Sequence, residues 1–173
     1  MKKQINDFLS TKYSEFFIRE EDINSNIPTF LIKPEGICPV IQGLKDEKTL
    51  SFTFLNDLTA IDWLGKKTPR FQVCYLLKSI ANNHFRVLIK TPVEDGDPVP
   101  SIVNIFKGAN WPEREIYDLF GISFTGHPRM DRLIMPDNFL GHPLRKDFPL
   151  EGYGQDYLIS DLLEMHTEDM EGA

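Results

Sequence analysis

Cysteine is scarce in this chain of 173 residues, where only Cys38 and Cys74 occur, far apart in the sequence. Without a Cys-x-x-Cys pair, the chain lacks the ligand spacing of tetrahedral zinc sites and cubane iron–sulfur clusters. Hydrophobic runs are also short: the longest, residues 73–77, is far below the stretch of about 20 that a membrane-spanning helix needs. The two lysines near the N-terminus precede no hydrophobic stretch, so no secretory signal is predicted. We expect free thiols in a reducing, cytosolic compartment.

Basic residues are absent from the C-terminal end. Residues 151–173 contain seven acidic side chains and no Lys or Arg, so the net charge of −7 lies there, and residues 1–150 carry 19 acidic and 19 basic side chains. A neutral body argues against nucleic-acid binding, which requires a basic stripe. We interpret the acidic tail as a solvated terminus or, alternatively, as a segment that docks on a basic partner.

The hydrophobic pattern predicts an α+β fold, with a small mixed or antiparallel sheet and helices packed on it. Helices are expected over residues 3–17 and 37–44, and strands over residues 28–33, 50–55, 71–78 and 85–91. The turn residues Asn82-Asn83-His84 join the last two strands into an antiparallel hairpin. Residues 93–100 have the composition of a loop.

A helix over residues 111–120 is the best-marked element. Asn110 resembles an N-cap, with Glu113 at capping-box spacing, and Gly121 ends the hydrophobic stripe. Arg114 and Asp118 are four residues apart and are expected to pair. Just upstream, Ser101 is expected to cap a short helix over residues 102–106.

The chain is predicted to divide into an α+β body (residues 1–125) and an extended C-terminal arm (residues 126–173). Proline recurs every six to eight residues between residues 128 and 149, which excludes a long helix. The same stretch is too hydrophobic for a free linker. An arm laid on another surface accounts for both facts, and a loop packed on its own body is the alternative.

Candidate chemistry is sparse. The densest charge cluster consists of Glu113, Arg114, Glu115 and Asp118. Because Arg114 lies between the carboxylates, we expect them to stay ionised in a structural or interface network rather than to act as acid and base. No Gly-x-Ser-x-Gly elbow, dinucleotide fingerprint or P-loop occurs. No enzyme site is therefore predicted from motifs alone.

Two Gly-His-Pro tripeptides carry His127 and His142. With Asp131 or Asp147 these histidines would supply metal ligands, but the flanking Gly and Pro favour turns. A set of basic side chains in the same region could bind a phosphate, but we expect it to pair with acidic groups of a protein partner. This basic set comprises Arg129, Arg132, Arg145 and Lys146.

Residues 113–122 (Glu-Arg-Glu-Ile-Tyr-Asp-Leu-Phe-Gly-Ile), followed by Gly126-His127-Pro128, resemble the signature of the C-subunit family of NADH-quinone oxidoreductase. This family belongs to the peripheral arm of respiratory complex I and has its equivalent, the J-subunit family, in cyanobacteria and plastids. Residues 57–62, 109–112 and 141–148 resemble the same family. One position departs from it, because Asp131 stands where the family usually has a basic residue, with Arg132 next to it.

The resemblance implies a non-catalytic scaffold that binds no cofactor itself. The holoenzyme would pass electrons from NADH through FMN and iron–sulfur clusters to quinone and translocate protons. The implied partners are the quinone-site subunit and the cluster-carrying subunits, at the cytoplasmic face of the inner membrane, with peripheral attachment. Alternatives are the matching subunit of a hydrogenase-type or ferredoxin-fed complex, and a stand-alone metal-dependent enzyme. The implied signature and interface residues are Glu113, Arg114, Glu115, Asp118, His127, Arg132, His142, Arg145 and Lys146.

Overall fold

The computed structural model describes residues 1–21 and 26–154, and it has the predicted α+β class. Its main sheet has five strands in the spatial order β1-β2-β5-β4-β3, and only β2 and β5 run parallel. The strands are β1 (Phe17–Glu21), β2 (Thr29–Ile32), β3 (Phe54–Asp62), β4 (Phe71–Ser79) and β5 (Phe85–Val93). The short strands β6 (Val99–Pro100) and β7 (Phe124–Thr125) pair in parallel.

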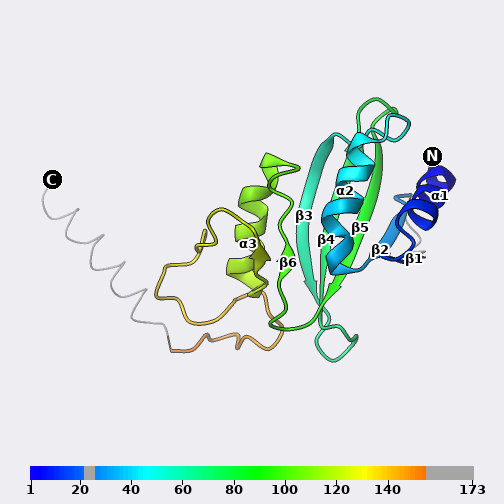
Figure 1. Ribbon diagram of the computed structural model, residues 1–173. Coiled ribbons are helices and arrows are strands. Elements are labelled where there is room, and N and C mark those ends of the chain that lie inside the picture. The colour runs from blue at the N-terminus through cyan, green and yellow to red at the C-terminus, as the bar shows by residue number, and fades with distance from the viewer. Residues whose placement is uncertain (22–25, 155–173) are drawn as a thin grey trace, which may run out of the picture.

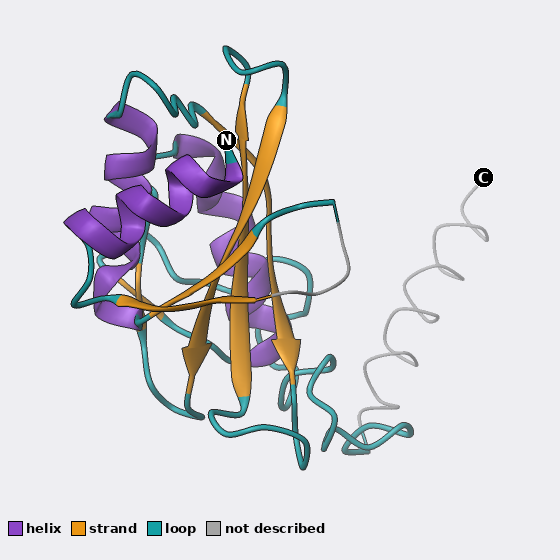
Figure 2. Ribbon diagram, turned by 90° about the vertical axis from the view of Figure 1, so that its right-hand side faces the viewer, coloured by secondary structure: helices purple, strands orange, loops and turns teal. Residues whose placement is uncertain are grey.

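Three α-helices accompany the sheet in the described chain, namely α1 (Lys2–Lys12), α2 (Ile37–Asp46) and α3 (Asn110–Phe120). Short 3-10 turns (Pro34–Gly36 and Lys107–Ala109) precede α2 and α3. Helices α1 and α2 cover one face of the sheet (Figure 2), and α3 lies beside edge strand β3 (Figure 1). No helix of the described residues has the length and hydrophobicity to cross a bilayer.

The core lies between the sheet and its helices. Alternate residues of β4, among them Phe71, Val73, Tyr75 and Leu77, point to the helix side and are fully buried. Helix α3 adds Ile116 and its neighbours to the same hydrophobic cluster. The predicted hairpin of β4 and β5 is confirmed over its whole length.

The strand predicted over residues 50–55 is displaced. Leu50 and Phe52 are buried as predicted, but they belong to a turn after α2, in which Phe52 N–H bonds to Leu44 O at 3.0 Å. Ser51 between them has φ of 47°, which a strand cannot contain. Strand β3 therefore begins at Phe54, because alternating burial arises here from a tight turn rather than from a pleated strand.

Two helix predictions need correction as well. Residues 102–106 form a turn, which begins where Ser101 Oγ accepts a hydrogen bond from Val103 N–H (3.2 Å), so no helix follows Ser101. Helix α1 ends at Lys12 instead of continuing to residue 17, and the missed strand β1 follows. The predicted loop over residues 93–100 ends in β6.

Residues 126–154 contain no helix or strand, as the spacing of proline predicts. In Figure 1 this stretch runs along α3 and then away from the sheet. We call residues 126–154 the described arm. Its contacts with α3 define the candidate site.

Candidate functional site

Helix α3 carries two completely buried carboxyl groups, Glu113 and Asp118. They lie five residues apart, and each accepts hydrogen bonds from a different segment of the chain. Buried carboxyl groups are uncommon, because removal from water disfavours their charged form. Burial raises the pKa of Glu113, whereas hydrogen bonds keep the pKa of Asp118 below its ordinary value.

Glu113 holds the segment that precedes the helix. Its Oε1 accepts a hydrogen bond from Ile102 N–H at 2.8 Å, and its Oε2 accepts one from Ser101 Oγ at 2.6 Å. Burial dominates these hydrogen bonds and raises the pKa of Glu113 to about 7. The predicted capping box does not form, since the N-cap position (Ala109) makes no side-chain cap hydrogen bond. The predicted ion pair is absent as well, because Glu113 bonds to Ser101 and Ile102 rather than to a cation.

Asp118 holds the described arm. Its Oδ2 accepts hydrogen bonds from the N–H groups of Leu133, Ile134 and Met135 at 3.0, 2.7 and 2.9 Å, and its Oδ1 accepts one from Arg132 Nη1 at 2.7 Å. Burial acts to raise the pKa of Asp118, but these four hydrogen bonds outweigh it and hold the pKa below its ordinary value. Three successive N–H groups form an anion-binding nest for the ionised carboxylate.

The predicted Arg114–Asp118 pair does not form, because Asp118 pairs with Arg132 instead. Arg114 instead donates to the main-chain oxygens of Asp131 (3.2 Å) and Arg132 (2.9 Å), and its guanidinium lies 5.7 Å from the centre of the Trp111 ring. Arg132 Nη2 donates to the carbonyl oxygens of Phe139 and Gly141 at 2.9 and 3.0 Å. Both arginines thus fasten the backbone of the described arm to α3.

The two histidines contact opposite ends of α3. His127 Nδ1 accepts from Arg129 N–H at 3.1 Å, so in the neutral ring its Nε2–H donates to Asn110 O at 3.1 Å. His142 Nδ1–H donates to Asp118 O at 2.8 Å. Asn110 and Asp118 are separated by about 12 Å along the helix axis, at 1.5 Å per residue.

The fold does not assemble the metal site considered for His127 and His142. Within residues 1–21 and 26–154, no group of three or more His, Cys, Asp and Glu side chains is placed to hold a metal ion. Asp131 pairs with Arg129, and Asp147 pairs with Arg70. Glu115, the remaining acidic residue of the cluster, is exposed on α3.

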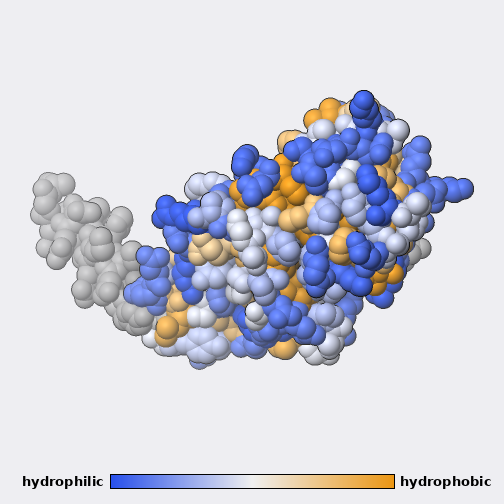
Figure 3. All heavy atoms as spheres, in the orientation of Figure 1, coloured by the Kyte–Doolittle hydropathy of each residue, from blue (hydrophilic) through white to orange (hydrophobic). Residues whose placement is uncertain are grey.

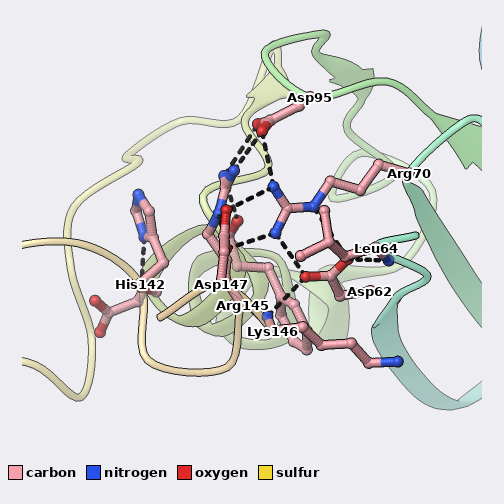
Figure 4. Close-up of polar contacts among 10 residues, drawn as sticks. Asp62, Leu64, Arg70, Asp95, His142, Arg145, Lys146 and Asp147 are labelled. Atoms are coloured by element: carbon pink, nitrogen blue, oxygen red, sulfur yellow. Dashed lines mark hydrogen bonds and ion pairs between the residues drawn. The ribbon is translucent and has the colours of Figure 1, made fainter. Parts of the chain in front are cut away.

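A second group of charges ties the described arm to the sheet (Figure 4). Arg70 donates to Asp62 Oδ2 at 2.7 Å, to Asp147 Oδ1 at 2.6 Å and to Asp95 Oδ2 at 3.2 Å. Burial acts to raise the pKa of Asp62, but hydrogen bonds from Arg70 and from the Lys146 and Leu64 N–H groups lower it to about 2. We call Asp62, Arg70, Asp95, Arg145 and Asp147 the clasp.

Arg145 supplies the second cation of the clasp. It pairs with Asp95, and its Nη1 lies 3.0 Å from Asp95 Oδ1 and 3.5 Å from Phe120 O. Lys146 contributes its main-chain N–H to Asp62 Oδ2 at 2.8 Å, while its ammonium group points away from the cluster in Figure 4. The acidic groups that the sequence placed on a partner for Arg129, Arg132 and Arg145 are in fact supplied by this chain.

Sequence reasoning missed Arg70 and Asp95 as members of this site. The ion pairs of Arg70 and Asp95 join residues 8, 25, 50 and 77 positions apart, so no local spacing signals these two residues. The other three members were within reach of the sequence, because Asp62 falls in the segment of family resemblance at residues 57–62, and Arg145 and Asp147 fall in the one at residues 141–148.

The outer side of the described arm and the start of α3 are hydrophobic. Six large side chains there are more than half exposed, and Figure 3 shows such surface at the end of the described arm, beside the grey residues. They are Trp111 (64%), Ile134 (53%), Leu140 (55%), Leu144 (52%), Leu150 (103%) and Tyr153 (54%). These hydrophobic side chains are therefore left accessible, while Met130 and Met135 of the described arm pack against the core.

Comparison with known proteins agrees with the sequence resemblance. Residues 30–154 match the family model described as respiratory-chain NADH dehydrogenase, 30 kDa subunit. The matched range includes α2, α3, the clasp and the whole described arm.

Two curated relatives show the extent of the similarity. The chain is 44% identical over 162 residues to the C subunit of NADH-quinone oxidoreductase from Herpetosiphon aurantiacus, covering 87% of this chain and 90% of the relative. It is 41% identical over 155 residues to the mitochondrial NADH-ubiquinone oxidoreductase 30.4 kDa subunit of Neurospora crassa. That match covers 90% of this chain and 54% of the relative, so the chain spans about half of the mitochondrial protein.

A solved structure has the same fold. The trypsin-resistant fragment (1–134) of Nqo5 aligns with a TM-score of 0.61 at 26% identity, covering 75% of this chain and 99% of the fragment.

Proposed function

Because the chain belongs to the family of the 30 kDa subunit of respiratory-chain NADH dehydrogenase, we propose that it is a non-catalytic scaffold subunit in the peripheral arm of a proton-translocating NADH-quinone oxidoreductase. In this role the chain binds no cofactor, and other subunits carry FMN, the iron–sulfur clusters and the NADH and quinone sites. The chain attaches peripherally, through the complex, to the cytoplasmic face of the inner membrane.

The exposed hydrophobic side of the described arm carries this proposal. Isolated hydrophobic residues on a surface are ordinary, but five that are more than half exposed within residues 134–153 favour an interaction site. Leu144 is an example, because its N–H is fixed to Leu119 O at 3.0 Å while its side chain is 52% exposed. The partners we propose are the quinone-site subunit and the cluster-carrying subunits.

The predicted site residues receive two proposed roles. One group stabilises the fold of the chain itself, because its polar atoms bind other segments of the same chain. It comprises Glu113, Asp118, Arg132 and His142. Exposed residues such as Glu115 remain candidates for direct partner contact. We likewise propose that residues 1–125 and 126–173 serve as body and interaction arm.

Affinity purification of the tagged chain from gently solubilised membranes tests the proposal. Recovery of NADH-, flavin-, cluster- and quinone-site subunits in fixed ratio is expected. Recovery of hydrogenase-type or ferredoxin-binding subunits instead assigns the chain to a related complex. Recovery of the chain alone contradicts the scaffold role.

Two matched variants locate the contact surface. Leu144→Glu places a charge on the outer side of the described arm and is expected to reduce co-purified subunits severalfold. Ile80→Glu makes the same type of change at a hydrophobic residue of similar exposure (54%) after β4, and is expected to have no effect. Equal losses for both variants contradict the assignment of this surface.

A further inference from the structure

Asp95 and Gly96 form the one Asp-Gly pair of the full sequence, in which Asn-Gly does not occur. An aspartate followed by glycine is the kind most prone to cyclise, because glycine has no Cβ to hinder the attack of its nitrogen on the neighbouring carboxyl carbon. Gly96 is exposed, and no atom of the described chain lies within 4 Å of the position that a Cβ would take. The pair is therefore a reactive sequence in an open place.

This pair lies in the connection between β5 and β6. Asp97 N–H donates to Glu94 O at 3.2 Å, so Asp95 and Gly96 are the two central residues of a β-turn. Gly96 has φ of 92°, which glycine adopts without strain. Both residues of the turn are exposed, so water reaches the bond between them.

The clasp restrains the carboxylate of Asp95. Arg145 donates to both of its oxygens, with Nη1 3.0 Å from Oδ1, and Arg70 Nη1 lies 3.2 Å from Oδ2. In Figure 4 the carboxylate points toward these two arginines. The arginine side chains are only 12% (Arg70) and 19% (Arg145) exposed, so their own surroundings hold them in place.

The same contacts keep the carboxylate ionised. The hydrogen bonds and the charge of Arg145, with the charge of Arg70, hold the pKa of Asp95 below its ordinary value. An ionised carboxylate is a poor electrophile, because its charge repels the attacking nitrogen and it has no hydroxyl group to lose as water. Cyclisation therefore requires the carboxyl group to leave the arginines and to gain a proton.

We propose that Asp95-Gly96 is a modification site at which isoaspartate forms, that Arg145 and Arg70 restrain its formation, and that the modification opens the clasp. The nitrogen of Gly96 bonds to Cγ of the protonated Asp95, and its proton leaves with the carboxyl hydroxyl as water, which closes a succinimide ring. Water then adds to the ring carbonyl that belonged to the main chain, and the ring opens to isoaspartate. One water leaves and one enters, so the mass is unchanged.

Isoaspartate deprives Arg145 of its partner. The main chain then runs through the former side chain and gains one carbon atom, while the free carboxylate is attached directly to Cα. This shorter group cannot keep the two-pronged pairing with Arg145, which depends on geometry. Arg70 still pairs with Asp62 and Asp147, so the change loosens one end of the clasp and leaves the body folded.

Incubation of the full chain at neutral pH and physiological temperature tests the restraint. Isoaspartate at position 95 is quantified over time by electron-transfer mass spectrometry, with a synthetic peptide of residues 91–99 as the unrestrained reference. We expect the full chain to react about tenfold more slowly than the peptide, as charge-assisted hydrogen bonds of ordinary strength imply. Equal rates overturn the proposal.

Two matched variants assign the restraint to the clasp. Arg145→Met is expected to form isoaspartate severalfold faster than the wild type. Arg129→Met removes an arginine of the same arm that pairs with Asp131 instead, and is expected to keep the wild-type rate. Urea unfolding of Arg145→Met gives its unfolded fraction. An unchanged rate in this variant, or an increase no larger than that fraction of the peptide rate, overturns the proposal.

Limited digestion by trypsin tests the opening of the clasp. The incubated wild-type chain is nicked briefly, and the isoaspartate content of fragments that end at Arg145 or Lys146 is compared with that of the uncut chain. Severalfold enrichment in these fragments is expected, because a released Arg145 is more accessible to the protease. Equal content in cut and uncut chains contradicts the opening.

Discussion

Glu113 is predicted to make the stability of the chain fall as the pH rises. The carboxyl group is completely buried, and its pKa rises from 4.5 to about 7 on folding. Below pH 4.5 both states bind the proton, and between pH 4.5 and 7 the unfolded state loses it first. The stabilisation is therefore complete at low pH and is lost as the pH rises through about 7.

The size of the effect follows from the pKa difference. Each pKa unit corresponds to about 1.4 kcal/mol, so the free energy of unfolding is expected to fall by about 3 kcal/mol in total. About 2 kcal/mol of this lies between pH 5.5 and pH 8, a range in which the chain can be studied away from strong acid.

Glu113→Gln isolates this contribution. A glutamine keeps the acceptor for Ile102 N–H, and its amide N–H can donate to Ser101 Oγ, which donates to Glu113 Oε2 in the wild type. Unlike the carboxylate, the amide has no charge to bury. The variant is expected to be about 3 kcal/mol more stable than the wild type at pH 8 and to approach it towards pH 4.5. Glu115→Gln, two residues along the helix and exposed, is the control and is expected to follow the wild type.

Urea unfolding of the full chain at a series of pH values, followed by tryptophan fluorescence, measures these differences. The quantity to compare is the free energy of unfolding of each variant minus that of the wild type at the same pH. Parallel pH profiles for the wild type and Glu113→Gln, or a less stable variant at pH 8, would refute the reasoning.

Three further substitutions test how the described arm is held. Asp118→Asn weakens the acceptor of four hydrogen bonds and should lower the unfolding free energy by about 3 kcal/mol in urea unfolding, with Glu115→Gln unaffected. Arg70→Met leaves Asp62 buried without a cation and should cost about 3 kcal/mol at pH 7, a loss that shrinks as the pH falls through about 2. Arg114→Ala should reduce assembled complex on native gels while turnover per assembled complex stays normal; full assembly with slow turnover contradicts it.

Local patterns in the sequence predicted those parts of the fold that depend on neighbouring residues. The hydrophobic stripe of α3 and its end at Gly121, which has φ of 80°, were visible in the sequence. The turn at Asn82-Asn83-His84 was visible too, and two of its residues adopt positive φ. These elements are fixed by periodicity and by backbone preference.

The polar contacts could not be predicted in the same way. Arg114 and Asp118 have ideal spacing for a helical pair, yet the buried carboxylate gains more from three N–H groups and Arg132 than from Arg114 alone. The burial of Glu113 depends on residues 101–102, which approach it only in the folded chain. The partner of each charged group therefore depends on the tertiary structure, which the spacing of residues along one helix does not reveal.

The nest that binds Asp118 has a consequence for tolerance to mutation. Since the three contacts at residues 133–135 are made by main-chain N–H groups, these hydrogen bonds do not depend on which side chains stand there. Ile134 is exposed, so a saturation library at this position should accept almost any amino acid for folding and reject proline, which has no N–H, whereas Met135 also packs against the core. The outward surface of the arm can therefore be redesigned for a new partner while its attachment to the body is left unchanged.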